Sequence, residues 1–484
     1  MRVIRACREM GISPVAVYSE ADEHALHVRM ADVALPIGPP QASESYLRIE
    51  RIVEAARSAG AEAVHPGYGF LAENPSFAQA CIDAGLVFVG PPPKAMRDLG
   101  LKTEARKLVK AAGVPVVPGT LDPVDDAQAL RKIAQDIGFP VALKAVAGGG
   151  GKGLRMVHEP DALEAAFRQA TSEAGAAFGD ASVYLEKAIE RPRHVEVQIL
   201  ADQHGNCVWL GERDCSIQRR HQKVLEESPS PAVGPELREN MGQVAVRAAQ
   251  AAGYTNAGTV EFLLAPDGNF YFLEVNARLQ VEHPVTELVT GLDLVREQIR
   301  IACGQPLGYD QSAIQRRGYA VECRINAEDT SAGWVPSTGR LTAYRAPSGP
   351  GVRVDSGVEE NDEISVFYDP MVAKLIVHAT TREQGLDRMQ RALREFLILG
   401  VRTSIPMHQW LMRHPAVRSG EVDTGWLERE WRAPSMAEDE VTRAAVAAAL
   451  LVDGHRSPAV VGQDGVASPP SSGWRLSARR VGLY

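Results

Sequence analysis

The sequence is poor in lysine, since only ten of its 52 basic side chains are lysines and the others are arginines. Its six cysteines are widely spaced and include no C-x-x-C pair, which excludes a recognisable zinc site or disulfide framework and favours a reducing compartment. No run of 18 or more apolar residues occurs, and the first residues lack the pattern of a secretory signal peptide. We therefore expect a cytoplasmic protein that does not span a membrane.

The overall composition is that of a globular protein. Hydrophobic residues make up 45% and charged residues 23% of the 484 positions, which excludes a disordered, collagen-like or coiled-coil chain. The formal net charge is -9, and no cluster of basic residues could follow a phosphodiester backbone, so we do not expect nucleic acid as a partner. A chain of this length predicts about three domains.

The N-terminal part has the alternating pattern of an α/β domain with a parallel sheet. A helix over residues 2–10 precedes a strand over 14–18, and strands over 61–65 and 86–90 flank a helix over 74–84. A domain of this kind normally begins with a strand. We therefore expect a Rossmann-like domain that lacks its first strand, either because the chain begins late or because the fold is a variant that begins with a helix.

Changes of pattern along the chain predict three domains and a tail. We place the domains at residues 1–99, 100–303 and 304–431. The remaining residues, 432–484, contain an alanine-rich helix followed by a stretch rich in serine, proline and glycine, which is typical of a linker.

A run of glycines over residues 148–153 indicates phosphate binding. It matches G-x-G-x-x-G, but a strand-like segment follows it instead of a helix, which excludes the dinucleotide fingerprint. A Walker A motif is excluded because Gly153 follows Lys152 where Ser or Thr is required. We predict a hairpin whose bare amides close over phosphates as a lid, with Lys144 on the preceding strand as a point charge. A flexible surface hairpin is the alternative.

Two carboxylates are predicted to face each other across a second hairpin. The sequence PDGN at 266–269 predicts a two-residue turn between two apolar strands, and pairing its first residue with its last sets Glu261 opposite Glu274. Facing carboxylates repel each other unless a cation lies between them, so this pair predicts a divalent metal site. The alternative is a four-residue loop with a bulge that separates the two carboxylates.

Polar residues continue at every second position after this hairpin, and in an extended segment they would share one face. Their mixture of acid, amide and guanidinium groups favours the floor of an active site over a solvent-exposed strand face. Glu282 is the candidate general base, and Arg278 could bind an oxyanion through two hydrogen bonds. The row consists of Glu274, Asn276, Arg278, Gln280 and Glu282.

Two further positions could serve either function or structure. Residues 212–227 are densely charged, as a solvated surface would be, yet they contain Lys223, one of the few lysines, close to Gln218 and His221. A functional role and a solvated face are about equally expected. Arg324 could take part in catalysis or in a buried structural salt bridge.

Five motifs together resemble the biotin carboxylase family of ATP-grasp enzymes, which includes the carboxylase parts of acetyl-, propionyl- and methylcrotonyl-CoA carboxylases. The resemblance covers roughly residues 1–431. It implies an N-terminal Rossmann-like (pre-ATP-grasp) domain, an ATP-grasp domain with a glycine-rich lid over roughly 116–189, and an α+β C-terminal domain. The motifs are HPGYGFLAEN (65–74), KAVAGGGGKG (144–153), EKAIERPRHVEVQ (186–198), ERDCSIQRRHQK (212–223) and EVNARLQVEHPVTE (274–287).

The resemblance also implies roles for individual residues. Glu282 would be the base, and Arg324 would face the ureido oxygen of biotin. The bicarbonate site would consist of Lys223, Arg278, Gln280 and Val281. Two Mg²⁺ or Mn²⁺ ions would be bound by Glu261, Glu274 and Asn276. The positions that match ATP contacts are Lys102, Lys144, Gly150, Gly151, Glu186, Lys187, Ala188, Ile189, His194, Gln218 and His221.

The implied reaction is the first half-reaction of an acyl-CoA carboxylase, a step of fatty acid metabolism. ATP and bicarbonate give carboxyphosphate, which releases carbon dioxide for attack by deprotonated biotin. No lysine follows Lys374 and no Ala-Met-Lys-Met motif occurs, so we expect biotin on a separate carrier protein and transfer by a separate carboxyltransferase subunit. Family members are commonly dimers, and the resemblance places Arg5 and Glu9 at that interface.

The chain departs from the family at its start, where a first β-strand and an N-R-G-E turn are absent. Two alternatives therefore stay open. One is another ATP-grasp ligase, such as a carbamoyl-phosphate-forming enzyme, although the EHPVTE segment and Arg324 argue against it. The other is a catalytically impaired or truncated fragment, although the complete polar row argues for catalysis.

Overall fold

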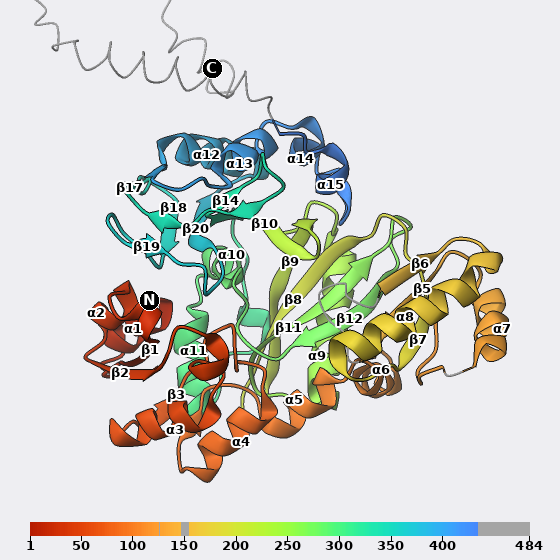
Figure 1. Ribbon diagram of the computed structural model, residues 1–484, viewed down its shortest axis with the longest axis horizontal. Helices are drawn as coiled ribbons and strands as arrows, with labels where there is room; N and C mark the ends of the chain where they lie inside the picture. The colour runs from red at the N-terminus through yellow and green to blue at the C-terminus, as the bar shows by residue number, and fades with distance from the viewer. Residues whose placement is uncertain (125, 147–153, 434–484) are drawn as a thin grey trace, which may run out of the picture. The chain divides into compact units, whose positions relative to one another are not determined.

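The computed structural model describes residues 1–124, 126–146 and 154–433 (Figure 1). The glycine loop, with Gly150 and Gly151, and the tail beyond residue 433 lie outside the described residues, as do the predictions made for them. Residues 1–431 form one compact unit.

The N-terminal part is an α/β unit that begins with a helix, as the sequence predicts. Its strands are parallel, but they form two separate pairs, β1 with β2 and β3 with β4, and no strand among the described residues joins the pairs. The elements are α1 (Arg2–Glu9), β1 (Val15–Ser19), α2 (Leu26–Met30), β2 (Val33–Gly38), α3 (Ile49–Ser58), β3 (Ala63–Val64), α4 (Pro75–Asp83) and β4 (Val87–Phe88).

A small antiparallel sheet with the strand order β6-β5-β7 follows. Two helices, α7 and α8, pack on it around a core that includes Leu143 and Leu185, and the opposite side of the sheet is left for polar groups. The elements are α5 (Pro93–Gly100), α6 (Lys102–Ala111), α7 (Ala127–Ile137), β5 (Val141–Ala145), β6 (Leu154–Val157), α8 (Leu163–Phe178) and β7 (Val183–Lys187).

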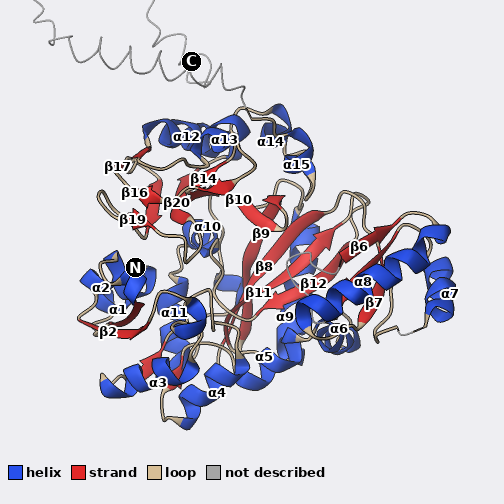
Figure 2. Ribbon diagram, in the orientation of Figure 1, coloured by secondary structure: helices blue, strands red, loops and turns tan. Residues whose placement is uncertain are grey.

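An eight-stranded antiparallel sheet of order β12-β11-β8-β9-β10-β13-β20-β18 carries most of the site (Figure 2). Along β8, Val195 and Val197 pack into the core with α5, α6 and α9, so His194 and Glu196 lie on the opposite face. The elements are β8 (Arg193–Ala201), β9 (Cys207–Arg219), β10 (Gln222–Ser228), α9 (Pro235–Ala251), β11 (Asn256–Leu264), β12 (Phe270–Asn276), β13 (Tyr319–Asn326), β18 (Val352–Ser356) and β20 (Met371–Ala379).

This sheet runs through the predicted domain boundary at residue 304, because β10 pairs with β13. Helix α10 packs on one face of β13 and β20, where Val285 and Val289 contact Ala320 and Ile376, and α12 packs on the other face. The elements are α10 (His283–Thr290), α11 (Leu294–Ala302), β14 (Glu328–Asp329), β15 (Val335–Pro336), β16 (Gly339–Arg340), β17 (Ala343–Arg345), β19 (Glu363–Ile364), α12 (Arg382–Glu395), β21 (Leu397–Leu399), α13 (Ile405–Leu411), α14 (Pro415–Ser419) and α15 (Trp426–Glu430).

Within residues 1–124, 126–146 and 154–433, no helix is long and apolar enough to cross a lipid bilayer.

Candidate active site

A cavity of about 590 Å³ is lined by residues of both the small sheet and the eight-stranded sheet. All predicted site residues line it except Glu282, which is buried behind it, and the two glycines outside the described residues. The lining residues from the prediction are Lys102, Lys144, Glu186, Lys187, Ala188, Ile189, His194, Gln218, His221, Lys223, Glu261, Glu274, Asn276, Arg278, Gln280, Val281 and Arg324.

The ammonium group of Lys223 lies at the centre of a buried ion-pair network. It donates to the carboxylates of Glu196 at 2.5 Å, Glu282 at 2.7 Å and Glu261 at 2.8 Å. Burial alone would lower the pKa of Lys223, but these three carboxylates raise it well above its ordinary value. Lys223 is therefore a fixed positive charge, and most of residues 212–227 are buried, although Arg220, His221 and Gln222 at the hairpin tip are exposed.

Sequence reasoning did not select Glu196, although it lies inside one of the motifs. It accepts a hydrogen bond from Arg213 Nε at 2.5 Å as well as from Lys223, and it is fully buried. The feature of the sequence that could have indicated Glu196 is the alternation of polar and apolar residues along 193–198, which places Glu196 on the same strand face as His194.

Glu261 faces Glu274 across β11 and β12, as predicted, but the turn is not the predicted one. Ala265 and Asn269 close a three-residue loop, because Ala265 N donates to Asn269 O at 2.8 Å. A β-bulge between Glu261 and Phe262 then shifts the register by one residue and brings the two carboxylates back into opposition. The bulge lies on the turn side of the pair, so it does not separate them.

The donor set at this hairpin fits a hard divalent cation. The carboxylate of Glu274 makes no hydrogen bond or ion pair with any described residue, while burial and then the charge of Glu261 raise its pKa. Asn276 offers an amide oxygen beside it, although Arg278 Nη2 now donates to that oxygen at 3.0 Å. Oxygen ligands with an unbalanced negative charge are what Mg²⁺ and Mn²⁺ require.

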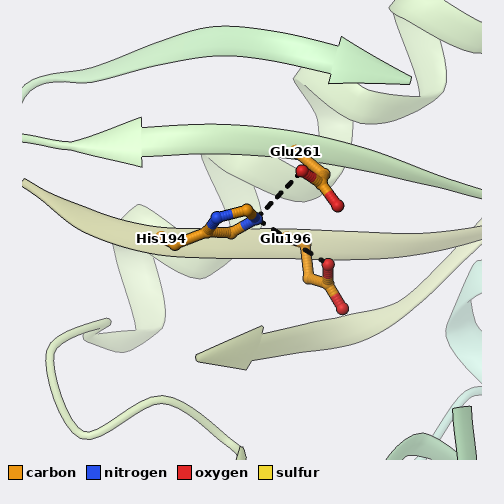
Figure 3. A group of neighbouring side chains, drawn as sticks. All are labelled: His194, Glu196 and Glu261. Atoms are coloured by element: carbon orange, nitrogen blue, oxygen red, sulfur yellow. Dashed lines mark ion pairs between the residues drawn. The ribbon is translucent and has the colours of Figure 1, made fainter. Parts of the chain in front are cut away.

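A second compact group of possible ligands comprises His194, Glu196 and Glu261 (Figure 3). His194 Nε2 lies 3.0 Å from Glu261 and 3.9 Å from Glu196, and the ring and both carboxylates converge in the figure. Burial alone would lower the pKa of His194, but the Glu261 carboxylate raises it. Lys223 pairs with both carboxylates and Arg213 also pairs with Glu196, so we interpret this group as an ion-pair network, in which Glu261 is the only member that also faces Glu274 across the hairpin.

The predicted polar row is a strand only as far as Asn276, where β12 ends. Arg278 and Gln280 follow in a loop, and Glu282 is the residue before α10. Pro284 at the second position of α10 presets helical geometry, which favours the start of a helix directly after Glu282. The side chains of Asn276, Arg278 and Gln280 still line the cavity.

Glu73 in the N-terminal unit holds this loop in place, and sequence reasoning missed it. Its carboxylate accepts from Ala277 N at 2.7 Å and from Arg278 Nε at 3.0 Å. Arg278 Nη1 also donates to Gln280 Oε1 at 3.2 Å. The guanidinium of Arg278 is thereby oriented before any anion arrives.

Glu282 is fully buried between two cations. It accepts from Lys223 at 2.7 Å and from Arg324 Nη2 at 2.9 Å, and Arg324 Nε donates to Glu226 at 2.6 Å. Burial alone would raise the pKa of Glu282, but Lys223, Arg324 and Arg213 hold it well below its ordinary range. Glu282 is ionised, as a general base must be, and Arg324 is in the buried salt bridge that the sequence left as an alternative.

Lys144 and Glu186, two of the residues predicted to contact ATP, line the cavity from the small sheet. Lys144 donates to Glu186 at 2.5 Å, and the buried Arg106 forms a second ion pair with the same carboxylate. The cavity is also lined by residues that the prediction did not select, although two of them, Tyr68 and Pro192, lie inside the quoted motifs. They are Tyr68, Met156, Tyr184, Pro192, Phe272 and Thr424.

Three family models match successive parts of the chain. "Biotin carboxylase, N-terminal domain" matches residues 1–96, and "Carbamoyl-phosphate synthase L chain, ATP binding domain" matches residues 102–309. "Biotin carboxylase C-terminal domain" matches residues 322–429.

Curated relatives match most of the chain. A pyruvate carboxylase subunit of Methanothermobacter thermautotrophicus is 55% identical over 428 residues, which cover 88% of this chain and 87% of the relative. The biotin carboxylase of Nostoc sp. is 53% identical over 428 residues, which cover 88% of this chain and 96% of the relative.

Solved structures agree with these relatives. One is the biotin carboxylase domain dimer of Hydrogenobacter thermophilus 2-oxoglutarate carboxylase in complex with MgADP, ADP and bicarbonate, with a TM-score of 0.84, 48% identity and coverage of 88% of this chain and 94% of that chain. Another is a biotin carboxylase complex with β-γ-ATP from Campylobacter jejuni, with a TM-score of 0.86, 44% identity and coverage of 89% and 96%.

The fold and the site therefore define an ATP-dependent ligase of the ATP-grasp class. Both terminal family models are specific to one branch of that class, and the relatives match nearly from end to end. The chain belongs to the biotin carboxylase family, whose members carboxylate biotin with the use of ATP. The alternative of a different ATP-grasp ligase is not favoured.

Proposed function

We propose that this cavity binds ATP with Mg²⁺ or Mn²⁺ and bicarbonate, and that the chain uses them to carboxylate biotin. The observation that carries the proposal is the contact of one buried base, Glu282, with two cations that substrates could engage, Lys223 and Arg324. The solved relatives bound to MgADP and bicarbonate, or to an ATP analogue, support the choice of substrates.

Lys223, Arg278, Gln280 and Val281 are proposed to hold bicarbonate. A bicarbonate anion would draw Lys223 and Arg278 toward itself, and because Lys223 is one of the two cations that contact Glu282, its turning away would raise the basicity of that carboxylate. Glu282 would then accept the proton of bicarbonate as its conjugate base attacks the terminal phosphoryl group. In the structure the ion pairs with Lys223 and Arg324 keep Glu282 ionised and weakly basic.

Arg324 is proposed to bind the ureido oxygen of biotin. Its Nη2 would leave Glu282 for that oxygen, while Nε remains on Glu226. A guanidinium aimed at this oxygen stabilises the negative charge that develops there when biotin is deprotonated.

At the nucleotide end, Lys102, Lys144 and the Glu186–Ile189 segment are proposed to contact ATP, together with His194, Gln218 and His221. Glu186 holds Lys144 at present, and Arg106 can keep Glu186 paired when Lys144 turns to a phosphate. Glu261, Glu274 and Asn276 would hold the divalent ions, which offset the charge of the transferring phosphoryl group.

We further propose that biotin arrives on a separate carrier protein and that a carboxyltransferase completes the reaction of an acyl-CoA carboxylase. The coverage of 96% of the Nostoc relative supports a biotin carboxylase subunit. The relatives differ in acceptor by name, from pyruvate to propionyl-CoA, and the transferase that selects the acceptor is a separate polypeptide in this proposal, so the proposal names the class of acyl-CoA carboxylases and no particular acyl-CoA. A homodimer through α1, with Arg5 and Glu9, and domains at 1–99, 100–303 and 304–431 belong to the same proposal.

ADP formation with bicarbonate tests this proposal when it is measured without biotin, with free biotin and with a biotinylated carrier domain. We expect turnover to depend on biotin and to be fastest with the carrier, and a carrier whose biotinylated lysine is replaced should not support it. Turnover that is independent of biotin would indicate another ATP-grasp reaction. Absence of turnover here and in a version extended upstream of Met1 would overturn the proposal.

A further inference from the structure

A pair of buried carboxyl groups lies directly behind Arg324. Glu226 on β10 and Glu322 on β13 are register partners in the antiparallel sheet, so their side chains stand on the same face. Both are fully buried. Helix α10 covers this face, since Ala320, two residues before Glu322, packs against Val285 and Val289.

Most oxygen atoms of this pair have no donor. Arg324 Nε donates to Glu226 Oε1 at 2.6 Å, but Glu226 Oε2 and both carboxylate oxygens of Glu322 have no hydrogen-bond partner within the part of the chain that the structure describes. Buried acceptors without donors are costly, and like charges directly opposite each other on neighbouring strands add to that cost. A proton on one carboxyl would turn an acceptor into a donor for the other.

The charges closest to the pair also favour one proton on it. The positive charges of Lys223 and Arg213 are offset by the negative charges of Glu196 and Glu261. Lys223 donates to both carboxylates, and Arg213 donates to Glu196. That leaves two cations, Arg324 and Lys374, for three carboxyl groups, Glu282 and the pair. The ionisable groups that face the pair from its neighbours are Arg324, Lys374, Glu282, Lys223, Cys215 and Cys323.

We propose that Glu226 and Glu322 share one proton and that this pair is a positioning device for Arg324. A singly protonated pair carries one negative charge, which makes the group of three carboxyls and two cations neutral. It keeps Glu226 as the anchor of Arg324 Nε, and the other side of the guanidinium can exchange Glu282 for a substrate oxygen. The proton sharing stands by itself, whereas the positioning part rests on the function proposed above for Arg324.

The titration properties of both groups agree with this geometry. Burial raises the pKa of Glu226 to about 7, with Arg324 acting in the opposite direction and the charge of Glu282 adding to the effect of burial. Burial raises the pKa of Glu322 well above its ordinary value, although Lys374 acts in the opposite direction.

Infrared difference spectroscopy of the full chain at neutral pH tests the shared proton. The wild type should show a C=O band of a protonated carboxyl group, and Glu322→Gln and Glu226→Gln should each remove it. Both substitutions keep side-chain size and leave a hydrogen-bonding amide. Glu363→Gln, at an exposed position, is the control that should retain the band. A wild type without a band would overturn the proposal even if a variant failed to fold, and a band that survives in Glu226→Gln would show that the proton is not shared.

The pH dependence of kcat/KM for free biotin tests positioning. Loss of the shared proton at alkaline pH adds negative charge behind Arg324 and should slow the wild type. Glu322→Gln keeps the neutral-pH charge, so we expect kcat/KM within about threefold of wild type at neutral pH but no corresponding alkaline decline. Glu226→Gln should lose about tenfold or more because Arg324 Nε loses its charged acceptor. A Glu322→Gln profile identical to that of the wild type would overturn the positioning role.

Discussion

Lys223 illustrates how one side chain can serve both structure and chemistry. Three buried carboxylates rely on its ammonium group for neutralisation. The same contacts hold the pKa of Glu282, the proposed base, well below its ordinary range. Structure and function cannot be separated at this position, because any substrate that engages Lys223 also changes the charge around Glu282.

Replacement of this lysine should therefore destabilise the fold as well as stop turnover. We expect Lys223→Met to lower the free energy of unfolding by about 3–5 kcal/mol, because it leaves buried charges unpaired. Denaturant unfolding checks this, with Lys94→Met as the control. Lys94 is exposed and pairs only with Asp98 among the described residues, so its loss should cost less than about 1 kcal/mol. An unchanged unfolding midpoint for Lys223→Met would contradict the network described here.

The site residues that sequence reasoning found and those that it missed differ in a simple way. Residues inside motifs with strict alternation, such as Glu261 and Glu274, could be placed on a common face. Glu73 lies inside the 65–74 motif, but nothing in that motif indicates that its carboxylate contacts Arg278, and Thr424 reaches the cavity from a distant segment without a local signal. Glu196 had a local signal but was one acid among several.

The β11–β12 hairpin shows that a correct partner can follow from an incorrect turn. The sequence predicts a two-residue turn, and the protein has a three-residue loop with a compensating bulge at Glu261. Loop length and bulge each shift the register by one residue, and the shifts cancel at the carboxylates. The alternation of the strands survives because Phe262 and Phe272 must stay in the core.

Because Glu261 faces Glu274, replacement of Glu274 should change the stability of the protein differently in the presence and in the absence of a metal ion. Glu274→Gln removes a like-charge pair, so we expect it to stabilise the ligand-free protein by about 0.2–1 kcal/mol. It should also abolish most of the further stabilisation that Mg²⁺ with ADP gives the wild type. Thermal unfolding with ADP, in Mg²⁺ and in excess chelator, measures both effects, with Glu363→Gln as the control. A variant that keeps the full Mg²⁺-dependent stabilisation would rule out Glu274 as a ligand.

The polar row from 274 to 282 was predicted as one extended segment, but it is a strand, a loop and the start of a helix. The period-2 pattern cannot distinguish a strand from a loop that happens to point alternate side chains into a cavity. Pro284 was the local signal for the helix that follows.

Over the whole chain, the sequence predicted the class of fold, but it did not predict which strands from distant segments pair with each other. Alternating strands and helices indicated an α/β protein, and the motifs indicated an ATP-grasp enzyme. The pairing of β10 with β13 joins segments separated by almost a hundred positions and places Glu226 beside Glu322. Such non-local pairing leaves no trace in a local pattern, so the carboxyl pair behind Arg324 was invisible in the sequence.

The buried side chain of His408 predicts how the free energy of unfolding depends on pH. Burial lowers the pKa of His408 to about 4, and its Nε2 contacts the carbonyl of Arg324 at 2.8 Å. The unfolded chain binds a proton near pH 6.5 and the folded protein does not, so stability is lost as the pH falls from about 6.5 to about 4. The loss from this residue approaches about 3 kcal/mol.

Unfolding measured across this pH range checks the prediction. His408→Gln should reduce the slope of the free energy of unfolding against pH by about 1.4 kcal/mol per pH unit, which corresponds to one proton fewer taken up on unfolding. Substitution of the exposed His24 is the control and should leave the slope unchanged. An unaltered slope in His408→Gln would contradict a neutral buried histidine.

The most direct test of the account follows isotope-labelled bicarbonate into biotin, with ADP formation and ATP binding measured on the same samples. The wild type should transfer label to free biotin and form ADP in step with it. Glu282→Gln should bind ATP with nearly unchanged affinity but lose about 10²–10⁴-fold in the rate of label transfer, because the base is gone and the nucleotide site is intact. Label transfer by Glu282→Gln at the wild-type rate would contradict the assignment of Glu282 as the base.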